Sequence, residues 1–282
     1  MVNVKEKLMK YVFAFAAITS IAAVILICIF LFANGIPSMA KYGLFKYLSG
    51  TVWKPGNNIF GILPMILGSI YVTAGALVLG VPVGILTAIY LARFCPKWLY
   101  KLVKPAVELL SGIPSIVYGF FGLVVIVPII AEKFDESGQS ILSASILLAI
   151  MILPTVITVS EAAIRAVPDS YYEGSLALGA SHERSVFFAT LPAAKSGILA
   201  GVILGLGRAI GETTAVMMVV GNQVRMPKGL VKGVRTLTTN IVMEMGYAAE
   251  LHREMLISTA VVLFVFILII NISFSVVKKR SG

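Results

Sequence analysis

Charged residues are scarce in this 282-residue chain, at 13% of the total, whereas 59% of the residues are hydrophobic. A soluble domain cannot bury that much apolar surface, so the composition excludes a soluble protein and predicts several membrane spans. The apolar runs are long and unbroken. A β-barrel would instead show segments of about ten residues with alternating polarity. The sequence therefore predicts an all-α membrane protein.

Cysteine and histidine are also rare, with two residues of each. Cys28 lies in an apolar run and Cys95 in a basic loop, so we expect neither a disulfide nor a cysteine-only metal site. His182 and His252 are far apart and no His-Glu-x-x-His pattern occurs, which disfavours a zinc protease. No Gly-x-x-x-x-Gly-Lys-Ser/Thr run is present, so the chain is not expected to bind ATP through a P-loop. We expect no cofactor, no metal and no catalytic residue.

Acidic residues are fewer than basic ones: the chain has 13 aspartates and glutamates and 23 lysines and arginines, for a formal net charge of +10. In a soluble chain such an excess can indicate nucleic-acid binding. Here much of the charge flanks apolar segments, as it does in cytoplasmic loops of membrane proteins. We therefore expect no nucleic-acid partner.

Six apolar segments are long enough to cross a lipid bilayer as helices. The first, at residues 11–33, has 23 residues without a charge, which is roughly 34 Å of helix. It is too long for the core of a signal peptide, so we expect it to be retained. The others cover approximately residues 63–91, 107–131, 141–164, 196–220 and 255–277. We divide the chain into an N-terminal helix with an external segment, 1–62, and a five-helix membrane core, 63–282.

Basic residues gather on one side of these six segments. They are Lys5, Lys7 and Lys10 before the first, Arg93, Lys97, Lys101 and Lys104 after the second, and Lys278, Lys279 and Arg280 at the end. Because positive residues stay inside, we expect both termini in the cytoplasm.

The segment 221–253 disagrees with this rule, because it falls outside and is also basic. Its basic residues are Arg225, Lys228, Lys232, Arg235 and Arg253. Two interpretations stay open. The segment either meets an anion or an acidic partner, or it is an ordinary solvated loop with Glu244, Glu250 and Glu254 as counter-charges.

Two charged residues, Arg208 and Glu212, lie inside the fifth apolar segment. A charged side chain near the centre of a spanning helix costs about 3 kcal/mol. Four residues apart on one helix, the two side chains would share a face and reach each other. They predict either a polar transport pathway or a buried structural ion pair. The hydroxyls of Ser115 and Thr213 are further candidate donors to a substrate in the pathway.

Small residues surround this pair of charges. Gly197, Gly201 and Gly205 recur every four residues, and Gly207 and Gly211 repeat the spacing. Small residues at this period let two helix backbones approach closely, so we expect these glycines, including Gly211, to pack against another helix. Arg208 would share their face and lie at a contact between helices. A proline in the run Gly112-Ile113-Pro114-Ser115 is expected to kink the third segment.

Residues 166–192 are too polar to span. Pro168 and Asp169 suit the start of a short helix, and Gly179 suits a sharp turn after it. We expect a second amphipathic helix to follow and to enter the membrane at Pro192.

The same loop resembles the EAA loop of ABC importer permeases. The resemblance rests on Glu173, on Gly179, and on Leu191 followed by Pro192, whereas Gly174 and Ser175 replace two alanines and Ala189 replaces an isoleucine. It implies the type I ABC importer permease fold. It also implies that this loop is the coupling helix, with Glu173, Gly179, Leu191 and Pro192 at the ATPase contact, and that separate subunits bind ATP.

Further runs resemble the permeases of phosphate importers, and the PstC type in particular. They are residues 112–122, 207–213, 60–64, 217–222, 238–241 and 244–247. The resemblance implies transport of inorganic phosphate across the cell membrane, with Arg208, Glu212, Thr213 and Ser115 along the substrate pathway. It implies three partners: a PstA-type permease in a heterodimer, an ABC ATPase dimer and an extracytoplasmic phosphate-binding protein. The alternatives are the PstA-type subunit itself or a permease for another oxyanion, such as sulfate or molybdate.

Two other classes of protein fit the sequence less well. An intramembrane serine hydrolase would need a histidine at bilayer depth, and none of the six segments contains one. A channel or carrier that works without ATP would not need the polar loop at 166–192.

Overall fold

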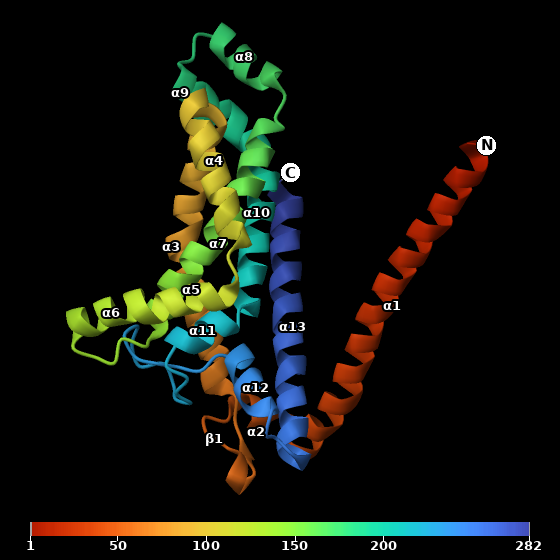
Figure 1. Cartoon of the computed structure of the whole chain (residues 1–282), viewed down its shortest axis with the longest axis vertical. Helices are drawn as coiled ribbons and strands as arrows, with labels where there is room; N and C mark the ends of the chain where they lie inside the picture. The colour runs from red at the N-terminus through yellow and green to blue at the C-terminus, as the bar shows by residue number, and fades with distance from the viewer. Residues whose placement is uncertain (1, 282) are drawn as a thin grey trace.

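A computed structural model describes the backbone of residues 2–281 and the side chains of residues 6–273, 275 and 276. The chain is predominantly helical (Figure 1). Within the described residues, six helical stretches are long and apolar enough to span a membrane: Glu6–Tyr42, Leu63–Phe94, Ser115–Phe134, Ile141–Arg165, His182–Gly211 and Glu250–Ser273. The prediction of six spanning segments is confirmed, but two of their boundaries move. The side chains of Lys5, Lys278, Lys279 and Arg280, used in the orientation argument, lie outside the described residues.

The first helix, α1 (Val2–Tyr42), leaves the bundle and touches it only near one end (Figure 1). Its side chains from residue 6 to 30 are almost all exposed. At its C-terminal end it packs on α13 (Glu250–Ser281), where a Cβ added to Gly35 would lie 2.6 Å from Val261 Cγ2. Ser258 Oγ donates a hydrogen bond to Gly35 O at 2.8 Å. An apolar helix this bare requires lipid or another membrane protein around it.

A small cap follows α1. It consists of α2 (Leu44–Ser49), a two-residue hairpin of β1 (Trp53–Lys54) and β2 (Ile59–Phe60), and a 3₁₀ turn between them, η1 (Pro55–Asn57). Trp53 pairs with Phe60 and Lys54 with Ile59 in antiparallel register. Trp53 and Phe60 are buried against Met255 and Leu256 of α13 and Leu237 of α12 (Leu237–Met245). The hairpin is thereby attached to the end of the bundle opposite α8 (Asp169–Ala177) (Figure 1).

The centre of the bundle is made of α3, α7 and α10. Their bounds are α3 (Leu63–Ile89), extended by a π-helical turn η2 (Tyr90–Phe94), α7 (Ile141–Arg165) and α10 (Leu191–Gly211). α7 is the most buried of the spans, and glycines of α3 and α10 let both neighbours approach it. A Cβ on Gly75 would lie 2.3 Å from Ser145 Oγ, and one on Gly84 would lie 2.8 Å from Val156 Cγ1.

The third predicted span is wrong in its boundaries. Instead of one helix over 107–131, the chain forms α4 (Lys97–Gly112), breaks at Ile113 and Pro114, and resumes as α5 (Ser115–Phe121), a π-helical turn η3 (Gly122–Ile126) and α6 (Val127–Phe134). Both break residues have extended backbone, as proline and its predecessor favour. α4 runs along the bundle, whereas α5 and α6 run across it (Figure 1).

The fifth predicted span is also shifted. The helix begins earlier, with α9 (His182–Ser185) and a π-helical turn η4 (Val186–Thr190) leading into α10. It ends at Gly211, because Glu212 is extended with ψ 124°, and α11 (Thr214–Val219) starts after the break. The stretch expected to span at 196–220 is therefore two helices.

The polar loop folds as the sequence predicts. α8 begins at Asp169 directly after Pro168, and Gly179 adopts φ +85° in the turn that follows it. α8 lies at the end of the molecule where α1 begins and α13 ends (Figure 1).

Candidate functional site

The two helix breaks meet in space. Ser115 Oγ, at the start of α5, donates a hydrogen bond to Glu212 Oε2 at 2.9 Å. Glu212 Oε1 accepts from the backbone N–H of Ala215, at the start of α11, at 3.1 Å. A Cβ on Gly119 of α5 would lie 3.0 Å from Ala215 Cα, so the backbones of α5 and α11 are in close contact. Glu212 thus joins the first turns of two short helices, where backbone N–H groups need acceptors.

Glu212 does not pair with Arg208, contrary to the interpretation of the sequence. The spacing of four residues brings two side chains together only while the helix continues. Here α10 ends between them, and the extended backbone of Glu212 directs its carboxylate to Ser115 and Ala215.

Arg208 lies on the last turn of α10 and is half-buried. Its guanidinium has no hydrogen-bond or ion-pair partner among the described residues. An arginine at bilayer depth normally pairs with another group or faces a water-filled space. Its donors are therefore not engaged by any acceptor among the described residues.

Thr213 completes the set of predicted pathway residues. Its hydroxyl donates to Gly211 O at 3.2 Å, which satisfies a carbonyl left free where α10 ends. All four predicted pathway residues thus lie at or beside the two breaks, but only Ser115 and Glu212 touch. Their role in binding a substrate stays a prediction.

Three of the predicted packing glycines face α7. Added Cβ atoms would lie 2.4 Å from Ala163 Cβ at Gly197, 3.0 Å from Ser160 Oγ at Gly201, and 2.9 Å from Val156 Cγ2 at Gly205. Gly211 differs, because it is exposed and an added Cβ would meet no atom within 4 Å. The packing expected of Gly211 is not found among the described residues.

The predicted coupling segment is exposed but anchored. Glu173 is exposed on α8, and Leu178, next to Gly179, is 91% exposed. Tyr172 Oη and His182 Nδ1 are 2.7 Å apart and tie α8 to α9. Arg93, after α3, forms an ion pair with Asp169 at 3.4 Å. The segment therefore presents its outer surface while its inner side is held to the bundle.

The first two residues of α10, Leu191 and Pro192, differ in exposure. Leu191 packs against the buried cluster of Ile164, Val186 and Ala194, whereas Pro192 is exposed. Glu173, Gly179, Leu191 and Pro192 are thus spread over the segment rather than gathered at one point, and their contact with an ATPase stays a prediction.

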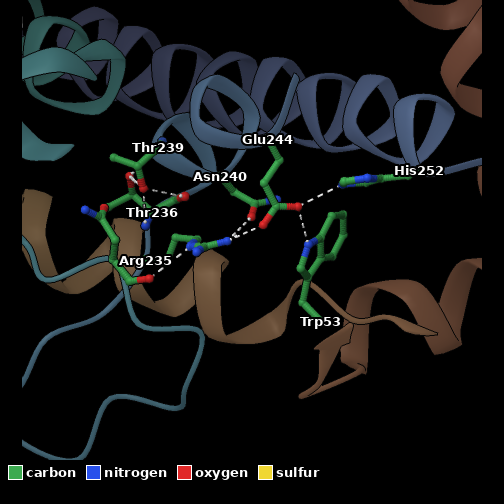
Figure 2. A network of polar contacts seen from close by, with 8 residues as sticks. Trp53, Arg235, Thr236, Thr239, Asn240, Glu244 and His252 are labelled. Atoms are coloured by element: carbon green, nitrogen blue, oxygen red, sulfur yellow. Dashed lines mark hydrogen bonds and ion pairs between the residues drawn. The ribbon is translucent and has the colours of Figure 1, made fainter. Parts of the chain in front are cut away.

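The sequence analysis missed a polar network at the opposite end of the molecule. Figure 2 shows the side chains of Arg235, Trp53 and His252 converging on Glu244. Glu244 Oε2 accepts from Trp53 Nε1 at 2.8 Å and lies 2.8 Å from His252 Nε2, while Oε1 pairs with Arg235 Nη1 at 2.5 Å. Glu244 belongs to the run 244–247 that resembles phosphate permeases, but its three partners are distant in sequence, so the local pattern does not reveal the network.

This network bears on the two interpretations of the basic segment 221–253. Arg235 pairs with Glu244, Lys232 with Glu136, and Arg225 Nε donates to Gly233 O at 3.0 Å. Lys228 and Arg253 are exposed. Three of the five basic residues are thus engaged within the chain, which favours an ordered, charge-balanced loop over an open anion site.

Two tyrosines near this end have shifted pKa values. Burial raises the pKa of the Tyr47 phenol, and its hydrogen bond with Thr259, at 2.7 Å, opposes the shift only in part. Partial desolvation and the Glu244 carboxylate raise the pKa of Tyr247, while Arg235 lowers it. Both phenols are neutral at physiological pH, so neither adds a charge to the network.

No cluster of three or more metal-ligating side chains was found within the described part of the chain. The geometry is that of a polar helix junction in a membrane bundle, with one unpaired arginine beside it and an exposed helix at one end.

Comparison of the sequence with known proteins identifies the family of the chain. Residues 80–281 match the family described as the binding-protein-dependent transport system inner membrane component. The chain is 39% identical over 266 residues to the probable ABC transporter permease protein YqgH of Bacillus subtilis, covering 90% of this chain and 86% of that one. It is 34% identical to the phosphate transport system permease protein PstC of Xylella fastidiosa, covering 78% of this chain and 74% of that one.

A solved structure has the same fold. It is a bacterial ABC transporter involved in the import of the acidic polysaccharide alginate, with a TM-score of 0.63 and 15% sequence identity over 94% of this chain and 95% of that chain. At that identity the likeness concerns the fold alone. Because the family match covers most of the chain, the protein belongs to the inner membrane components of binding-protein-dependent transport systems, which are the permease subunits of ABC importers.

Proposed function

We propose that this chain is the PstC-type permease subunit of an ATP-driven importer that moves inorganic phosphate into the cell. The relative from Xylella fastidiosa carries that name and is 34% identical. The observation that carries the proposal is the unpaired guanidinium of Arg208, which lies on the last turn of α10 beside the junction of Ser115 and Glu212.

Arg208 suits a tetrahedral oxyanion chemically. A guanidinium offers five donors in a planar fork that matches two oxygens of phosphate. Since Glu212 is bonded to Ser115 and Ala215, it does not occupy that fork. Because Glu212 is only four residues from Arg208 in the sequence, its carboxylate counters part of the positive charge of the guanidinium. This limits how tightly an anion is held, as a pathway that must release its substrate requires.

The proposed complex has three kinds of partner. A PstA-type permease would cover the open side of α10, an ATPase dimer would contact α8, and an extracytoplasmic phosphate-binding protein would meet the end with the hairpin. Closure of the ATPases would move α8, and the permease pair would alternate its opening. In this orientation both termini are cytoplasmic.

Replacement of Arg208 tests the pathway. We expect Arg208→Gln to assemble with its partners but to lower phosphate uptake in vesicles by about tenfold or more, equivalent to about 1.4 kcal/mol of lost stabilisation. Lys10→Gln, which removes an exposed positive charge on α1 away from the bundle, is the control and should leave uptake unchanged. Normal uptake by the Arg208 variant would contradict the pathway, and loss of assembly would instead assign Arg208 a structural role.

Two alternatives concern the identity of the subunit and its anion. Sulfate and molybdate are also tetrahedral oxyanions that a guanidinium binds. The anion that stimulates ATP hydrolysis by the assembled complex, presented on its binding protein, decides between them. Pull-down with separately tagged PstA-type and PstC-type subunits decides which of the two positions this chain fills. A channel that works without ATP would co-purify with no ATPase.

A further inference from the structure

Glu244 is buried at the end of the molecule remote from α8, with only 6% of its surface exposed. Its three side-chain partners come from separate parts of the chain: Trp53 from the hairpin, Arg235 from the loop before α12, and His252 from α13. Removing one partner of a buried ion pair is strongly destabilising, because the other charge stays buried and unpaired. Glu244 therefore joins three elements that no regular secondary structure connects.

Arg235 is held on every side. Besides Glu244, its guanidinium donates to Asn240 Oδ1 and Asn222 O, both at 3.0 Å. Its backbone carbonyl packs directly on α3, where a Cβ added to Gly68 would lie 2.5 Å from Arg235 O. The position of the residue after it, Thr236, is thereby determined by the network.

Thr236 begins the connection to the helix junction. Its hydroxyl caps α12 and lies 3.0 Å from Thr238 Oγ1, which donates in turn to Glu212 O at 3.4 Å. Ser69 of α3 accepts from Leu237 N at 3.0 Å and holds the same turn. A cavity of about 10 Å³ lies at this point; its polar lining residues are Ser69, Thr73, Glu212, Thr236 and Thr238. That volume is about one water molecule.

We propose that Glu244 is a positioning residue for the Ser115–Glu212 junction, acting through Arg235 and the Thr236–Thr238 turn. The effect on transport rests on the proposed function, whereas the positioning of the junction by Glu244 is independent of it. Movement of the hairpin or of α13 at the outer face, as when a binding protein docks, reaches Glu212 through this turn. The side chain of Glu244 touches no substrate.

The test uses the full chain in lipid nanodiscs, with Cys28 and Cys95 replaced by serine. A single probe, Thr73→Cys, is introduced; Thr73 is 7% exposed and lines the cavity. We expect Glu244→Gln to raise the rate of thiol labelling at this probe by about tenfold, within the range of coupling between linked sites. Glu250→Gln, the same change at an exposed glutamate of α13, should leave the rate unchanged. An unchanged rate in the Glu244 variant overturns the proposal.

A second probe separates local movement from loss of structure. Ser160→Cys, on the fully buried part of α7, should stay protected in Glu244→Gln. If both probes become reactive, Trp53→Phe decides, because it removes one donor to Glu244 but keeps a ring against Phe60. In the Trp53→Phe variant, faster labelling at position 73 but not at position 160 supports the proposal. An unchanged rate at position 73 in that variant overturns it.

Transport gives the functional readout. In vesicles with all partners, we expect Glu244→Gln to raise the ATP hydrolysed per phosphate moved several-fold, whereas a merely less stable complex would lower both rates in proportion. An unchanged ratio overturns the part of the proposal that concerns transport. If the wild-type complex moves no phosphate, the proposed function fails, and the labelling result still stands by itself.

Discussion

Arg208 and Glu212 differ in how the protein accommodates a charge among apolar helices. Glu212 is satisfied by one hydroxyl and one backbone N–H, both from other helices. Arg208 has no such partner among the described residues. Because leaving a charge unpaired in a low-dielectric region is costly, such a site is kept where the charge performs a function. The two residues are therefore better regarded as a structural carboxylate and a candidate substrate-binding cation than as an ion pair.

Removal of the Ser115 hydroxyl should weaken the junction. Hydrogen bonds to charged groups contribute about 1.5–3 kcal/mol, so we expect Ser115→Ala to lower the free energy of unfolding by about that amount and to reduce uptake. Thermal unfolding of the chain in nanodiscs measures the first effect. Ser111→Ala, an exposed serine at the end of α4, is the matched control. Equal unfolding temperatures for the two variants would argue that Ser115 contributes nothing to the junction.

At the scale of elements, close approach of α3 and α10 to α7 organises the bundle. Glycines supply that approach on both sides of α7, as at Gly84 and Gly205, which contact different methyl groups of Val156. The period of four in the sequence predicts a packing face on α10. It does not identify α7 as the partner, nor does it reveal that the face ends before Gly211.

Substitution of the glycines tests this packing. An added side chain at Gly205 would begin 2.9 Å from Val156, so we expect Gly205→Leu to destabilise the bundle by about 1–3 kcal/mol through overpacking. Gly211→Leu places the same side chain where no atom lies within 4 Å and should unfold at the wild-type temperature when the chain is alone. Similar losses in both variants would mean that helix propensity, not packing, governs these positions.

At the scale of the whole molecule, two ends are specialised differently. One presents α8, with the exposed Leu178 at its tip, and the other holds the hairpin, α12 and the Glu244 network (Figure 1). The helix breaks of Ser115 and Glu212 lie between them and contact the end that holds α12 through Thr238. A permease driven by ATPases on one side and loaded from the other needs such a connection through its length.

The turn after α8 is the place to interrupt this connection. Gly179 has φ +85°, which costs a residue with a Cβ about 1–2 kcal/mol, so Gly179→Leu should reorient α8. We predict assembly with the ATPases but loss of the stimulation of ATP hydrolysis by loaded binding protein. Gly174→Ala, within α8 and with open space around it, should retain stimulation. Intact stimulation in the Gly179 variant would remove this turn from the coupling pathway.

The sequence by itself determined the number of spans, the short helix and turn at Asp169–Gly179, and the family of the chain. The spans and the short helix follow from composition, hydropathy and local spacing, which act over a few residues, whereas the family follows from the resemblance of short motifs to those of known permeases. Tertiary structure alone decided that Glu212 bonds to Ser115, 97 positions away, and that Glu244 gathers Trp53, Arg235 and His252. A single extended residue separates two side chains that an i, i+4 spacing would bring together on a continuous helix. Only the packing of distant segments determines which partner each polar group then binds.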